Sequence, residues 1–68
     1  MRRTDLIAIM DAAKAANGGA EDFTFEVSAG DVRSADTILR HLKENFIITS
    51  WSRERGSNSI SVTGYTGD

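Results

Sequence analysis

Residues 23–27 alternate apolar and polar side chains, in the order Phe-Thr-Phe-Glu-Val. This period of two predicts an extended strand with one face buried. The stretch lies between two segments with helical patterns, so its conformation decides the fold class. An extended strand predicts a mixed α+β domain with a two-layer architecture, whereas a coil turn leading into a middle helix would overturn that architecture.

The segments on either side of this strand have helical periodicity. We expect a first helix over residues 4–16, capped by Thr4 and ended by the Asn-Gly-Gly of residues 17–19, and a second helix over residues 31–44. Three side chains are candidate N-caps for the second helix: Ser28, Asp31 and Ser34. The apolar positions fall on one face of each helix: Leu6, Ile9, Met10 and Ala13, then Val32, Ala35, Ile38, Leu39, Leu42 and Phe46.

The last third of the chain predicts a β-hairpin. Two stretches rich in β-branched and aromatic residues flank a polar segment at 53–58 that contains a glycine. Pairing Trp51 with Ile60 places residues 54–57 in a four-residue loop. Residues 64–68 are expected to be a frayed tail.

These elements predict a single α+β domain over residues 1–68, in the order helix, strand, helix, strand, strand. The expected architecture is a two-layer sandwich with both helices on one face of a three-stranded antiparallel sheet. The pattern leaves the position and direction of the first strand open. The expected core contains Leu6, Ile9, Met10, Phe23, Phe25 or Val27, Ile38, Leu42, Phe46, Trp51, Ile60 and Val62.

The size and composition of the chain narrow the classes of function. A chain of 68 residues buries a modest core, which leaves little room for an enclosed catalytic cleft. The absence of cysteine excludes disulfides and cysteine zinc sites, so we expect a cytoplasmic location and neither a cofactor nor a metal. No segment approaches the roughly 20 apolar residues of a membrane span.

Acidic and basic side chains are segregated along the chain, a pattern that suggests binding of another macromolecule. Residues 1–32 carry three basic and six acidic side chains, whereas residues 33–58 carry five basic and three acidic ones. The overall net charge of −2 argues against nonspecific coating of nucleic acid, which requires clustered Lys and Arg. The basic second part still leaves a specific nucleic-acid contact open.

The C-terminal half resembles a winged-helix domain, in which a recognition helix is followed by a β-hairpin wing. The similarity covers residues 34–48, the basic loop at 53–56 and the closing strand at 60–62, about half of the chain. It implies contacts to bases from Arg33, Thr37, Arg40 or His41, and to phosphates from Arg53 and Arg55. A winged helix also needs a middle helix, and the strand predicted at 23–27 takes its place, so this fold is the alternative.

No catalytic constellation is evident in the sequence. His41 is the only histidine and the first candidate acid or base, but it lies off the apolar stripe beside Arg40, so we expect it to be a solvent-exposed bystander. We therefore expect a non-enzymatic accessory or regulatory protein that binds another macromolecule, with a protein partner as the leading interpretation. Homodimerisation is left open. The alternative is a DNA-binding module that uses the helix at 34–45 and the hairpin tip at 53–58.

Overall fold

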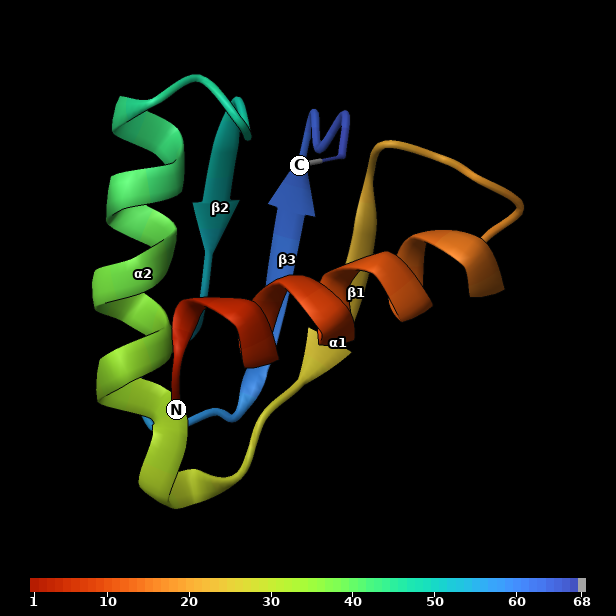
Figure 1. Cartoon of the computed structure of the whole chain (residues 1–68). Coiled ribbons are helices and arrows are strands. Elements are labelled where there is room, and N and C mark those ends of the chain that lie inside the picture. The colour runs from red at the N-terminus through yellow and green to blue at the C-terminus, as the bar shows by residue number, and fades with distance from the viewer. Residues whose placement is uncertain (68) are drawn as a thin grey trace.

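The computed structural model describes residues 1–67 and has two α-helices and one three-stranded antiparallel sheet (Figure 1). The elements follow in the predicted order: α1 (Arg3–Ala16), β1 (Phe23–Glu26), the short 3-10 helix η1 (Ala29–Asp31), α2 (Val32–Glu44), β2 (Ser50–Ser52) and β3 (Ser59–Thr63). The α+β fold predicted from the sequence is confirmed. The winged-helix alternative is wrong as a fold, because β1 stands where a middle helix would be required.

The sheet has the order β1-β3-β2, so β3 is its central strand. Both edge strands run antiparallel to β3: Phe23 faces Val62 on one side, and Trp51 faces the same Val62 on the other. β1 and β2 are therefore parallel to each other and are connected through α2, with β3 inserted between them. This settles the strand order and direction that the sequence pattern left open.

Both helices cover the same face of the sheet. In Figure 1, α1 crosses in front of the strands and α2 runs beside β2. Alternate residues of β1 and β3 point into the layer between sheet and helices, as the period of two requires. One core cluster results, made of Leu6, Met10, Phe23, Phe25, Val27, Ala35, Leu39, Leu42, Ile48, Ile60, Val62 and Tyr65.

The hairpin register differs from the predicted one by two residues. Trp51 faces Val62 instead of Ile60, and the loop spans residues 53–58. A shift of two residues keeps every side chain on its predicted face, so the apolar pattern cannot distinguish the two registers. Within the longer loop, the side chain of Arg53 donates to the carbonyl oxygen of Ser57 at 3.1 Å.

The tail prediction is wrong for Tyr65, which is fully buried. Its ring packs edge-on against Phe23 with ring centroids 5.8 Å apart, and its hydroxyl donates to Asp11 Oδ1 at 2.6 Å. Its backbone N–H donates to the carbonyl oxygen of Glu21 at 3.0 Å. These contacts bind the segment after β3 to α1 and to the start of β1. Asp68, which the prediction of a frayed tail also included, lies outside the described residues.

The first helix begins earlier than predicted. Arg2, not Thr4, holds the N-cap position, and its backbone N–H donates to Asp5 Oδ2 at 3.0 Å. A carboxylate in the first turn satisfies a backbone donor and also interacts favourably with the positive end of the helix. At α2 the N-cap position is held by Asp31, one of the three candidates, after the turn of η1.

Candidate functional site

The predicted binding residues of α2 form one exposed ridge. Arg33, Thr37, Arg40 and His41 are all exposed, on the face opposite the buried Ala35. The Thr37 hydroxyl donates to the carbonyl oxygen of Arg33 at 3.2 Å, a bond that keeps the side chain close to its own helix. The structure thus brings the four α2 residues together on a solvent-facing surface.

Arg53, in contrast, is held within the fold. Its Nε donates to Asp36 Oδ1 at 3.1 Å and its Nη2 donates to Asp36 Oδ2 at 2.6 Å, a two-pronged contact between the hairpin tip and α2. Hydrogen bonding to this carboxylate raises the pKa of Arg53 above its usual value. Nη1 donates to the carbonyl oxygens of Ser57 and Glu54. Asp36 is therefore bonded across elements, and Arg53 joins the hairpin tip to α2.

Arg55 remains exposed at the tip of the hairpin, apart from this contact. The predicted phosphate-binding pair Arg53 and Arg55 is consequently divided between a fixed guanidinium and an exposed one. The sequence could not reveal this division, because the Asp36 partner lies 17 residues away.

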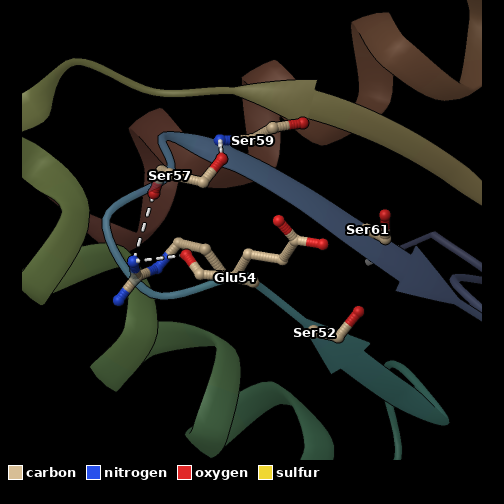
Figure 2. A pocket seen from close by; sticks show the side chains of 6 residues that line it. Ser52, Glu54, Ser57, Ser59 and Ser61 are labelled. Atoms are coloured by element: carbon tan, nitrogen blue, oxygen red, sulfur yellow. Dashed lines mark hydrogen bonds between the residues drawn. The ribbon is translucent and has the colours of Figure 1, made fainter.

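The outer side of the hairpin contains a hollow of about 280 Å³. Figure 2 shows the Glu54 side chain extending over the hairpin, with Ser52, Ser59 and Ser61 on the strands beside it. Ser57 and Arg53 complete the lining, and the Ser57 hydroxyl accepts a hydrogen bond from the Ser59 N–H at 3.0 Å. The hollow offers hydroxyl groups and one free carboxylate, and its lining holds no histidine or lysine to activate a serine.

Side chains that could bind a metal are scattered over the part of the chain that the structure describes. Among residues 1–67, no three His, Asp or Glu side chains gather into a group that would hold an ion. Within the same part of the chain, neither helix has the length and apolar character required to cross a membrane.

Phe46 is the large hydrophobic residue that the structure leaves exposed. The apolar spacing predicts that it lies in the core, and this prediction is wrong: its side chain is 90% exposed. The apolar spacing continues to residue 46, but α2 ends at Glu44, so residue 46 no longer follows the geometry of the helix. Ile48, two residues further on, occupies the core instead and is 2% exposed.

The backbone of Phe46 is left-handed, with φ of 60°. It occupies the position after the C-cap residue Asn45, and two hydrogen bonds close the turn: the Phe46 N–H donates to Lys43 at 3.1 Å and the Ile47 N–H donates to Leu42 at 2.9 Å. This bonding pattern is a Schellman motif, whose left-handed position is usually glycine. Phe46 is the only non-glycine residue among residues 1–67 with a positive φ.

Comparisons of the chain with protein-family models, with curated proteins and with solved structures give no match.

Proposed function

We propose that this chain is a small non-enzymatic accessory or regulatory protein that acts by binding another protein, with Phe46 as its anchor. The observation that carries the proposal is the combination of 90% exposure and a left-handed backbone at one aromatic residue. A cytoplasmic location is part of the proposal and rests on the sequence composition.

Phe46 is unfavourable for the folded chain in two ways. A left-handed conformation costs a residue other than glycine about 1–2 kcal/mol. An exposed ring also leaves unused the roughly 1.5–3 kcal/mol that burial of a Phe side chain contributes. Strained conformations concentrate at functional positions, and aromatic side chains are frequent among the residues that dominate protein interfaces. A partner that buries the ring would explain why a phenylalanine stands where glycine would fit better.

The expected partner has an apolar pocket with an acidic rim. The last turns of α2 present the exposed side chains of Arg40, His41 and Lys43, with Glu44 as the acidic neighbour. A second copy of the chain is a poorer fit, because the hollow on the hairpin is lined by serine and charged side chains. A lone ring also provides far less apolar area than an interfacial membrane helix uses.

The test is parallel capture from a cell extract with tagged wild-type protein and the variants Phe46→Gly, Phe46→Leu and, as a control on the hairpin tip, Glu54→Ala. A direct partner should be retained by wild type, Phe46→Leu and Glu54→Ala. It should be lost with Phe46→Gly, because loss of a dominant interface residue costs about 2 kcal/mol or more, roughly a 30-fold fall in affinity. Titration with the purified partner would then measure that ratio. Equal capture by Phe46→Gly would contradict the proposal.

DNA binding is the second candidate function, and the exposed ridge of Arg33, Arg40 and His41 with Arg55 is the observation that favours it. Neutralising phosphates with these side chains would make binding steeply dependent on salt. Titration of mixed-sequence duplex DNA at low salt, with wild type, Arg33→Ala/Arg40→Ala and Arg55→Ala, separates the two functions. Salt-dependent binding that these variants abolish would support DNA binding as the function. The absence of binding by the wild type would exclude it.

A further inference from the structure

The open edge of the sheet at β1 is a second surface, on the opposite side of the sheet from β2. β1 pairs only with β3, so its other side has no neighbouring strand in residues 1–67. Figure 1 shows β1 at the margin of the sheet, with the connection from α1 looping outward beyond it. An exposed edge strand is a template for an additional strand.

The register identifies the backbone groups that remain free at this edge. The Val27 N–H donates to the carbonyl oxygen of Asn58 at 3.2 Å, and the same alternation makes Phe25 and Phe23 the residues that bond to β3. The N–H and C=O groups of Thr24 and Glu26 therefore point away from β3. Among the backbone hydrogen bonds formed outside the helices and the sheet ladder, none in residues 1–67 uses them.

The edge is also acidic. Glu21 and Asp22 precede β1, Glu26 is its last residue, and all three side chains are exposed. No Lys or Arg occurs between Lys14 and Arg33. One oxygen of Asp22 accepts a hydrogen bond from the Gly64 N–H at 3.0 Å, a bond that leaves the negative charge in place.

We infer that β1 receives an added strand from a basic, extended segment of a partner protein. Main-chain hydrogen bonds to Thr24 and Glu26 supply the pairing, and the carboxylates select basic side chains on the outer face. A second copy of the chain is rejected at this edge, because pairing β1 with β1 would bring like charges together. Nucleic acid is rejected by the same negative charge.

The probe is a capped ten-residue peptide that alternates Lys and Val, titrated into the ¹⁵N-labelled protein. The control peptide alternates Glu and Val, so it has a similar β-propensity and the opposite charge. With the Lys peptide, saturable shifts should centre on the amides of Thr24 and Glu26. Their hydrogen exchange should slow about tenfold when about 90% of the protein is bound. The Glu peptide should produce neither change.

Variants at Thr24 and at the two glutamates separate edge pairing from simple attraction of charge. Thr24→Pro removes the outward N–H and leaves the bonds to β3, so it should abolish the amide shifts while Thr24→Val retains them. The double variant Glu21→Lys/Glu26→Lys changes only exposed side chains, so it should fold. It therefore keeps the inference testable if Thr24→Pro does not fold. It should weaken Lys-peptide binding about tenfold, because each exposed ion pair contributes a few-fold, and should allow the Glu peptide to bind.

Any of three peptide-binding results would overturn the inference: no saturable change with about 1 mM Lys peptide, shifts centred away from β1, or wild-type binding by a folded Thr24→Pro variant. A doubled mass in light scattering that Thr24→Pro returns to monomer would identify a second copy as the occupant and would also overturn it. The inference is independent of Phe46, so Phe46→Gly should bind the Lys peptide as wild type does. The experiment therefore distinguishes a failure of the inference about the β1 edge from a failure of the proposal about Phe46.

Discussion

Replacing Tyr65 tests whether the segment after β3 is a structural part of the fold. The side chain is fully buried, packs against Phe23 and donates its hydroxyl to Asp11. Truncation of a large buried aromatic side chain to Ala costs about 3–5 kcal/mol. At roughly 0.05–0.15 kcal/mol per residue, the whole chain has about 3–10 kcal/mol of stability. Tyr65→Ala should therefore remove much or all of the free energy of unfolding.

Tyr65→Phe isolates the hydroxyl contact from the packing of the ring. A hydrogen bond to a charged group contributes about 1.5–3 kcal/mol, but the Asp11 side chain is exposed and regains water when the hydroxyl is removed. We expect a loss of about 1 kcal/mol. A double-mutant cycle with Asp11→Ala should give a coupling energy of similar size.

The assay is urea unfolding followed by circular dichroism. With a slope near 1 kcal/mol per molar urea, as for small domains, Tyr65→Phe should lower the midpoint by about 1 M. Wild-type protein provides the reference slope, which should not change in the variant. A cost below about 1 kcal/mol for Tyr65→Ala would refute the reasoning and restore the frayed tail predicted from the sequence.

Three further predictions concern the core, the turn after β3 and the hairpin tip. Leu42→Ala should cost about 2–5 kcal/mol in urea unfolding, because its side chain is fully buried. Gly64→Ala should destabilise more than Gly56→Ala: both glycines have positive φ, but a Cβ at Gly64 would collide with Thr49, whereas at Gly56 it would meet open space. Arg53→Lys should speed hydrogen exchange of the amides in the hairpin loop, because a lysine cannot make the two-pronged contact with Asp36. Exchange of the core amides should stay as in the wild type. Equal loop exchange rates in variant and wild type would contradict this prediction.

The sequence predicted the elements of the fold because their signals are local. The alternation at residues 23–27 and the apolar face of residues 31–44 each arise within one segment, and both are confirmed. The hairpin register was not predictable, because a shift of two residues leaves the same side chains on the same face. The contact between Arg53 and Asp36 joins the hairpin to α2, so it leaves no signal within either segment of the sequence.

Phe46 and Tyr65, whose burial differs from the prediction, show the limits of periodicity. Phe46 continues the spacing of a helix that has already ended, and no glycine follows the helix to signal the left-handed turn. Tyr65 lies beyond the last strand, between two glycines at 64 and 67 that favour a loose tail, and only its tertiary contacts show that it is buried. Of the candidate binding residues, the α2 ridge was predicted as a group, whereas Phe46 was not predicted at all as a binding residue.

The free energy of unfolding of Phe46→Gly tests most directly the claim that Phe46 serves something outside the fold. Glycine adopts the left-handed turn without strain, and the exposed ring it removes contributes no buried area. The variant should be as stable as the wild type or more stable by up to about 1 kcal/mol. Relief of the left-handed strain stabilises it, and the greater entropy of glycine in the unfolded chain offsets part of that gain. A loss of more than about 1 kcal/mol would show that the ring stabilises the fold itself and would contradict the account.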